Sequence, residues 1–326
     1  LAARVRVLML GRSLEGLADL GIAALHKVQA YRLAAVLQAT RSAVMFATFA
    51  TAFASSGDAV VSTAIFVAAG GIFTLCLEVP AARRAYQRFD LDELAETVAD
   101  RTSAWQWASR YIPLGVCSLL IVGFGALPRF AIHHQINLAA VGIFESLAAL
   151  TIIFDLLCTS AARVMTPRFA AAVQQRRADA ARRLYRTATT FYLGLGAVAV
   201  ACSWQFGATA AAWIYGSQYG AHAGLLSILM AARAISAASN FDACLLSFDR
   251  RRALFWTWVT SSMVLAAGLL ALTPNFGMVG AGWSVVIANF VRCAIVHRRV
   301  ARDLAELETS RSDLTLPAGS PINRAA

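Results

Sequence analysis

Charge is scarce in this sequence of 326 residues, because only 14% of the residues are charged whereas 59% are hydrophobic. Soluble domains carry about 25% charged residues, since their surfaces face water. A chain with about half that share needs a solvent that does not require charge, and lipid is such a solvent. The composition excludes an ordinary soluble domain and predicts a membrane protein.

Motifs for catalysis and for metal binding are also missing. The sequence contains no H-E-x-x-H, no Walker loop, no G-x-S-x-G and no pair of carboxylates placed for acid–base work on a soluble substrate. The six cysteines lie in apolar runs and form no C-x-x-C pair. We therefore expect them to be buried and to pack as small hydrophobic residues. Adjacent His133 and His134 lack a third ligand and are interpreted as interfacial residues. We therefore predict no enzyme, no metal site and no cofactor.

Lysine is nearly absent, since Lys27 is the single lysine among 29 basic residues. A net charge of +11 can indicate nucleic-acid binding, but here the arginines lie between apolar runs. We therefore attribute the charge pattern to membrane topology, and we predict no nucleic-acid partner.

Long apolar runs, by contrast, are abundant. A membrane-spanning helix needs about 20 mostly apolar residues, and eight runs meet this requirement. They cover residues 36–55, 58–78, 110–129, 137–160, 187–206, 223–247, 253–273 and 278–297. A ninth stretch, residues 14–25, is shorter and contains Glu15 and Asp19, so it either spans the membrane or lies at its surface. The predicted fold class is an all-α polytopic transmembrane helix bundle with about eight or nine spans.

The arginines predict the orientation of these spans, because short cytoplasmic loops carry an excess of Lys and Arg. Residues 83–101 contain four arginines, residues 163–186 contain seven and residues 250–252 contain three. On the other side, the connections at residues 55–57, 207–222 and 273–278 contain no Lys or Arg. Arg129 is the one basic residue in the predicted loop after the third run. We therefore expect a cytoplasmic C-terminus.

Residues 79–109 form the longest polar break between the runs, and residues 91–98 within it suit an amphipathic surface helix. This break is predicted to be a cytoplasmic linker. It separates residues 1–78, with two or three spans, from a six-helix group at residues 110–300. Residues 301–326 are expected to form a disordered cytoplasmic tail.

Ionisable residues inside the apolar runs are the candidate site residues, because a charge in mid-membrane costs at least about 2.5–3.5 kcal/mol without a partner. The ionisable candidates are Arg41, Glu145, Asp155, Arg233 and Asp242, and the polar residue Asn240 is added to them. At 100° per residue, Glu145 and Asp155 project within about 80° of one another and suit one cavity. Arg233 and Asp242 project to opposite sides, so one of them is expected to contact a neighbouring helix. Substrate contact and internal ion pairing both stay open.

Short motifs in a fixed order add a resemblance. Pro128-Arg129-Phe130 is followed by the segment 141–145, by Thr166-Pro167-Arg168-Phe169, by the segment 214–219 and by the glycine-rich segment 275–282. In this order and topology, residues 13–300 resemble the polysaccharide flippase family of the multidrug/oligosaccharidyl-lipid/polysaccharide exporter superfamily.

The resemblance implies a two-lobe exporter architecture with an incomplete first lobe, since the chain lacks three helices that such proteins have at the start. It also implies alternating access, in which undecaprenyl-diphosphate-linked oligosaccharide is flipped across the bacterial inner membrane for O-antigen, capsule or exopolysaccharide assembly. Arg41 and Arg233 would hold the diphosphate. Glu145 and Asp155 would couple flipping to a proton or sodium gradient or bind sugar hydroxyls. The partners would be lipid-linked oligosaccharide, membrane lipids and other glycan-assembly membrane proteins.

Three alternatives to this function remain. A multidrug exporter of the same superfamily would have a more apolar cavity and a cation-coupled acidic residue. A membrane enzyme of glycan assembly, such as a polymerase or ligase, is disfavoured by the short outward connections. An inactive fragment or accessory scaffold would fit the missing helices.

Overall fold

Every regular element in the part of the chain that the structure describes is a helix. The computed structural model describes residues 30–87, 104–238 and 242–314, together with single positions between Gly16 and Leu25. The predicted all-α class is therefore confirmed. The stretch 14–25 and the surface helix expected at 91–98 lie largely or wholly outside the described residues.

The chain divides into two compact units, an N-terminal unit (Leu1–Thr102) and a C-terminal unit (Ser103–Ala326). The described helices of the N-terminal unit are α2 (Tyr31–Ser56), α3 (Ala59–Phe73), the π-helical turn η1 (Thr74–Glu78) and α4 (Val79–Gln87). Those of the C-terminal unit are α6 (Ala104–Gln135), α7 (Leu138–Leu150), α8 (Ile152–Gln174), α9 (Ala178–Tyr215), α10 (Ser217–Gly220), α11 (Ala223–Ala238), α12 (Asp242–Ser247) and α13 (Arg251–Leu314).

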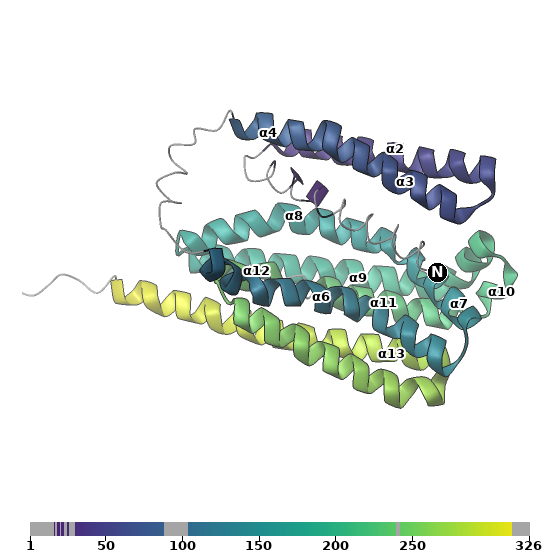
Figure 1. Ribbon diagram of the computed structural model, residues 1–326. Helices are drawn as coiled ribbons and strands as arrows, with labels where there is room; N and C mark the ends of the chain where they lie inside the picture. Colours follow the sequence, from purple (N-terminus) through teal and green to yellow (C-terminus); the bar gives the residue numbers. More distant parts are fainter. Residues whose placement is uncertain are drawn as a thin grey trace, which may run out of the picture. The chain divides into compact units, whose positions relative to one another are not determined.

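Six of the described helices are long and apolar enough to cross a membrane, or seven if the bent pair α7 and α8 counts as one span. The longest candidate, Arg251–Thr309, contains two of the runs that we predicted as separate spans. It is divided at Gly277, whose φ of 58° and ψ of −138° are not helical. Figure 1 shows that the two arms of α13 run antiparallel. Each of the eight predicted runs therefore lies in its own helix, helix arm or helix pair.

Glycine is required at the reversal of α13 for two reasons. A positive φ is accessible to glycine without a steric penalty, and Gly277 has one. Three residues later, a Cβ built on Gly280 would lie 2.2 Å from the carbonyl oxygen of Leu272. The two arms therefore approach so closely here that any side chain at position 280 would collide with backbone.

Buried apolar side chains form two clusters in the C-terminal unit. One is built around Phe169, Tyr192 and Trp258, and the other around Ile132 and Leu265. Close helix packing supports the first cluster, since a Cβ on Gly196 of α9 would lie 2.6 Å from the Cβ of Ala234 on α11. These clusters hold α6, α8, α9, α11 and α13 together around the cavity described below.

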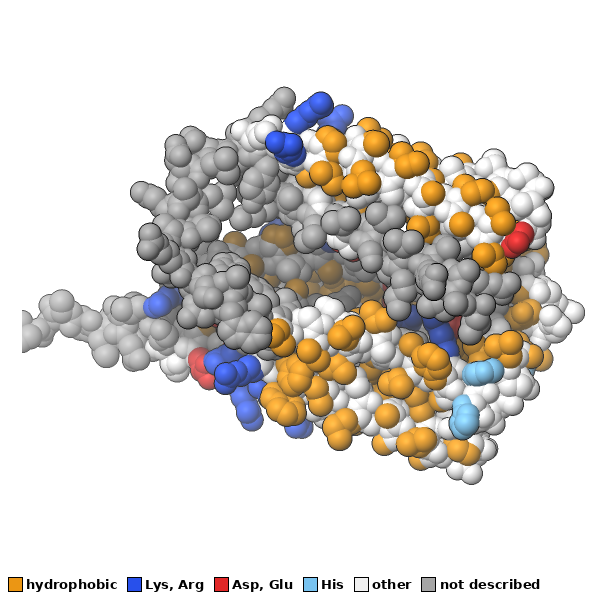
Figure 2. Space-filling view, viewed as in Figure 1, with side chains coloured by type: hydrophobic (Ala, Val, Ile, Leu, Met, Phe, Trp, Pro, Cys, Tyr) orange, Lys and Arg blue, Asp and Glu red, His pale blue; other side chains and the backbone are white. Residues whose placement is uncertain are grey.

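The outer faces of the spanning helices are apolar, as lipid contact requires. Large hydrophobic side chains such as Leu119, Phe130 and Leu270 are about 70% exposed. Figure 2 shows hydrophobic side chains over the middle of the C-terminal unit, with basic side chains gathered towards one end. The expectation that all cysteines are buried is wrong for Cys76 and Cys202, which lie on exposed faces.

The structure differs from the expected disordered tail at residues 301–314, because α13 continues to Leu314, and residues 315–326 lie outside the described residues. Ion pairs explain the extra turns. Arg250 contacts Asp303 at 3.1 Å and Glu306 at 2.8 Å, while Arg182 of α9 contacts Glu308 at 2.7 Å. Polar sequence without apolar periodicity was interpreted as disorder, whereas here it forms a helix attached by charged side chains.

Candidate functional site

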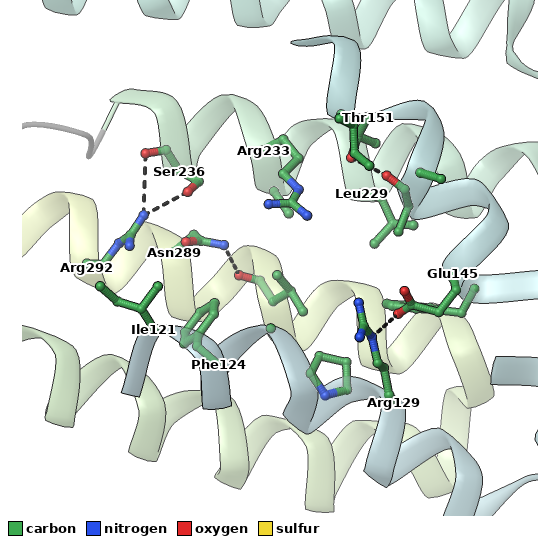
Figure 3. Close-up of a pocket in the computed structure, with 18 of the residues that line it drawn as sticks. Ile121, Phe124, Arg129, Glu145, Thr151, Leu229, Arg233, Ser236, Asn289 and Arg292 are labelled. Atoms are coloured by element: carbon green, nitrogen blue, oxygen red, sulfur yellow. Dashed lines mark hydrogen bonds and ion pairs between the residues drawn. The ribbon is translucent and has the colours of Figure 1, made fainter. Parts of the chain in front are cut away.

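A polar cavity of 440 Å³ lies inside the C-terminal unit, and we call it the arginine cavity. Helices α6, α7, α8, α11 and α13 line it, together with Asp242 at the start of α12. Its charged lining residues are Arg129, Glu145, Arg233, Asp242 and Arg292 (Figure 3). The volume falls within the range of about 300–1,000 Å³ that is typical of sites for small molecules.

The first ion pair of the cavity joins α6 to α7. Nε of Arg129 donates to Oε1 of Glu145 at 2.6 Å. We predicted Arg129 in a loop, and this is wrong because α6 continues to Gln135. Pro128 and Arg129 resemble a helix end in the sequence, but the carboxylate of Glu145 compensates the guanidinium within the bundle.

The second ion pair joins α8 to α11. Nη1 of Arg233 lies 3.1 Å from Oδ2 of Asp155, and the Arg233 side chain is 45% exposed. The chain bends by 41° between α7 and α8, so Glu145 and Asp155 do not lie on one straight helix. Glu145 lines the cavity directly, while Asp155 contributes through its contact with Arg233.

The third charged group is a buried cluster around Arg292 of α13. Its guanidinium carbon lies 4.2 Å from the centre of the Trp258 ring, and Nη2 donates to Oγ of Ser236 at 2.8 Å. Asp242 lies 4.0 Å from Nη1 of Arg292 and accepts a hydrogen bond of 3.0 Å from Nε1 of Trp258. Cation–π contact and charge pairing together compensate a guanidinium that is only 4% exposed.

Arg292 was missed by the sequence analysis, although it lies inside the run 278–297 and meets the same criterion as the other candidates. The criterion of an ionisable residue within an apolar run, applied without regard to its distance from the run's end, would have found it.

The prediction that Arg233 and Asp242 project to opposite sides is wrong, because both line the arginine cavity. The prediction assumed ideal rotation of 100° per residue from Arg233 on α11 to Asp242 at the start of α12, and residues 239–241 between these helices lie outside the described residues. Asp242 does contact a neighbouring helix, through Trp258 of α13. Asn240 lies outside the described residues.

Arg41 lies in the other unit and lines a separate cavity of 430 Å³. Asp19, Gln38 and Phe49 also line this second cavity. The structure therefore brings four of the six predicted residues together, namely Glu145, Asp155, Arg233 and Asp242, and it gives Arg41 different neighbours.

The arginine cavity contains charges of both signs. Its three arginines face three carboxylates, and the side chains of Arg129 and Arg233 remain about half exposed. Planar guanidinium groups match phosphate and carboxylate oxygens in pairs. Among the described residues, no group of three or more His, Cys, Asp or Glu side chains is placed to hold a metal ion.

Comparisons with known proteins identify the fold. No protein-family model and no curated protein matches the sequence. Among solved structures, the chain is similar to a MATE protein in the bent conformation, with a TM-score of 0.72 and 14% identity, covering 95% of this chain and 70% of that one.

Two further structures are an inward-facing and an outward-facing multidrug resistance MATE family transporter of the MOP superfamily. Their TM-scores are 0.69 and 0.72, each at 14% identity and 94% coverage of this chain, covering 72% and 70% of those chains. At 14% identity these neighbours show the fold of this chain. The described helices therefore form a multi-pass membrane protein with the fold of MATE transporters.

Proposed function

We propose that this protein is a membrane transporter that works by alternating access and that the arginine cavity holds its cargo. The fold supports this proposal, because structures with the same fold include both inward-facing and outward-facing transporters. The cavity supports it as well, since it places charged side chains within a bundle whose outer face is apolar. Intramembrane ionisable residues of this kind mark transport pathways in membrane proteins.

The cargo that this cavity fits best is an anionic lipid headgroup, and we assign undecaprenyl-diphosphate-linked oligosaccharide to it. The observation that carries the assignment is the half-exposed pair of guanidinium groups on Arg129 and Arg233. A diphosphate offers oxygens in the geometry that guanidinium forks bind. The sugars would occupy the polar remainder of the cavity while the prenyl chain stays in lipid, in the inner membrane of a bacterium.

The two ion pairs of the arginine cavity can couple cargo binding to an ion gradient. Glu145 and Asp155 form ion pairs with Arg129 and Arg233, respectively. A diphosphate that binds these arginines competes with the two carboxylates and leaves them without their partners. Uncompensated carboxylates at this depth are costly, so a proton or Na⁺ replaces the lost cation. Exchange of partners therefore links the occupancy of the cavity to an ion gradient.

A second candidate is the export of cationic drugs. It is supported by the neighbours, which include multidrug resistance transporters. Phe124, Phe144 and Trp258 also line the cavity and offer aromatic surface to an organic cation. For such a cargo the acidic residues would be the ligands, and the arginines would oppose binding.

Variants of one ion pair separate the two cargoes. Arg233→Gln should weaken binding of geranylgeranyl diphosphate about tenfold, because one charge-assisted contact is lost. Asp155→Asn should bind this probe at least as strongly as the native chain, since it releases Arg233 from its partner. Titration of the purified chain in detergent, with geranylgeraniol as the uncharged control, measures both effects.

Drug export predicts the opposite pattern for the same two variants. Asp155→Asn would then weaken the binding of ethidium, and Arg233→Gln would strengthen it. Native affinity for the diphosphate probe in Arg233→Gln, together with ethidium binding that depends on Asp155, would replace the flippase assignment with the drug exporter.

The orientation that we propose has a cytoplasmic C-terminus, on the basis of the arginine distribution. Single cysteines at Ser217 and Asn275 should react with an impermeant thiol reagent in intact spheroplasts, whereas one at Gln174 should react only after lysis. All three native side chains are exposed. The native cysteines have to be replaced first, because Cys76 and Cys202 are also exposed. Reaction of position 174 alone in intact cells would reverse the orientation.

A further inference from the structure

A groove lies in the C-terminal unit between α9 and the arm of α13 that follows Gly277, and we call it the α9/α13 groove. Its volume is 310 Å³. Arg182 and Arg186 are among the residues that line it from α9, and His297 and Leu304 line it from α13. The residues that line this groove and those that line the arginine cavity do not overlap, so the two sites are separate.

The α9/α13 groove lies where the apolar part of both helices ends. On α9, the apolar run 187–206 begins directly after Arg186, and on α13 the run 278–297 ends directly before Arg298. An apolar run of about 20 residues crosses the hydrocarbon core, so its end marks the boundary between hydrocarbon and headgroups. Since both walls have this boundary at the groove, the groove lies at the depth of phospholipid headgroups.

Arg186 supplies a positive charge that is not committed to a protein carboxylate. Its side chain is exposed, and it takes part in none of the ion pairs between described residues. Arg182, one turn earlier, is paired with Glu308 at 2.7 Å but is still 46% exposed. Guanidinium groups bind phosphate oxygens in pairs, so the groove suits a phosphate group.

His297 offers a further donor from the opposite wall. Its Nδ1 lies 2.8 Å from the hydroxyl oxygen of Tyr185, and the two ring centres are 5.6 Å apart. Tyr185 is buried, whereas His297 is exposed. When the tyrosine hydroxyl donates to Nδ1, the ring proton lies on Nε2, which can donate to a phosphate oxygen. A buried tyrosine thus orients an exposed imidazole at the groove.

Exposed apolar side chains continue from the groove towards the middle of the membrane. Leu193 follows Arg186 by seven residues, and Phe290 precedes His297 by seven. Two helical turns contain 7.2 residues, so each of these apolar side chains lies on the same helix face as its polar counterpart. Leu193 is 54% exposed and Phe290 is 63% exposed. A ligand with a phosphate group and acyl chains would contact both parts, whereas a soluble phosphate would contact only the first.

We propose that the α9/α13 groove binds an anionic phospholipid, with its phosphate on Arg186 and His297 and its acyl chains along Leu193 and Phe290. Basic pockets between spanning helices bind anionic lipid headgroups in other membrane proteins. In the orientation proposed above, the lipid belongs to the cytoplasmic leaflet. The site does not depend on the cargo of the arginine cavity. A lipid that binds only the folded chain stabilises it, here by joining α9 to the arm that carries Arg292.

A lipid titration of the full chain in detergent, followed by native mass spectrometry, tests the proposal. The native chain should bind dioleoyl phosphatidylglycerol at one tight site, and Arg186→Gln should weaken this site about tenfold, because one charge-assisted contact is lost. Arg183→Gln is the matched control on the same helix, since Arg183 is exposed but does not line the groove. It should bind like the native chain. Both variants should unfold at the native temperature in lipid-free detergent, because both side chains are exposed.

Two further ligands identify the source of the phosphate. Dioleoyl phosphatidylcholine has the same acyl chains and a zwitterionic headgroup, and it should bind the native chain at least about tenfold more weakly. Glycerol 3-phosphate has no acyl chains and should show no binding over the same concentrations. Equal affinity for glycerol 3-phosphate and phosphatidylglycerol would replace the lipid with a soluble phosphate and overturn the proposal.

Two variants locate the lipid. His297→Phe keeps a ring but removes both nitrogens, so it should weaken phosphatidylglycerol binding about threefold. Arg233→Gln should keep the native affinity for phosphatidylglycerol while it loses affinity for geranylgeranyl diphosphate. Loss of phosphatidylglycerol binding in Arg233→Gln but not in Arg186→Gln would place the lipid in the arginine cavity. That result, or equal affinity of the native chain for phosphatidylglycerol and phosphatidylcholine, would overturn the proposal and leave the assigned cargo to its own test.

Discussion

Arg292→Met is expected to lower the free energy of unfolding by about 3 kcal/mol, because removal of one partner leaves the other buried and uncompensated. The native guanidinium is 4% exposed and contacts Trp258, Ser236 and Asp242. Thermal unfolding in detergent, followed by tryptophan fluorescence, measures the change. Since Trp258 stacks on Arg292, its emission should also shift in the folded state.

Arg298→Met is the matched control on the same helix, because Arg298 is exposed. Its effect should stay within about 0.5 kcal/mol. The double variant Arg292→Met/Asp242→Asn should recover part of the loss, since it removes the uncompensated carboxylate together with the guanidinium. Full native stability of Arg292→Met would show that the cluster contributes nothing to folding.

Gly280→Ala is expected to destabilise the chain by about 3 kcal/mol, at the upper end of the cost of overpacking. The added Cβ would meet the carbonyl oxygen of Leu272 at 2.2 Å. This neighbour is backbone, so it cannot rotate away as a flexible side chain would. The arms of α13 would have to separate, and the arm that carries Asn289 and Arg292 would shift in the cavity. Thermal unfolding and binding of the diphosphate probe measure the two consequences.

Gly123→Ala is the control for this substitution, because a Cβ at position 123 meets nothing within 4 Å. Alanine in a helix interior is favoured over glycine by roughly 0.5–1 kcal/mol, so this variant should be as stable as the native chain or more stable. Equal stability of the alanine variants at 280 and 123 would contradict the close approach of the two arms.

The helices of this protein were predictable because their signal is local. An apolar run of about 20 residues needs no information about its neighbours, and every predicted run corresponds to a described helix, helix arm or helix pair. The reversal of α13 was predictable as well, because Gly277 lies in the predicted connection 273–278. The break between α7 and α8 was not predictable, because Thr151 does not interrupt the apolar run 137–160.

The site residues were predictable only as single positions. Glu145 and Asp155 stand out as charges in apolar runs, whereas their partners depend on which helices pack together. Arg129 was placed in a loop because its pairing with Glu145 joins residues 16 positions apart. Burial and pairing are properties of the packed bundle, and they distinguish these cases.

The extension of α13 has a practical consequence for imaging. The arm after Gly277 runs to Leu314 and is roughly 55 Å long at 1.5 Å per residue, whereas the hydrocarbon core is about 30 Å thick. Ion pairs from Arg182 and Arg250 attach the protruding part to the rest of the C-terminal unit. A helical partner protein joined in register at Leu314 would continue a braced helix and provide a rigid alignment marker for electron cryomicroscopy.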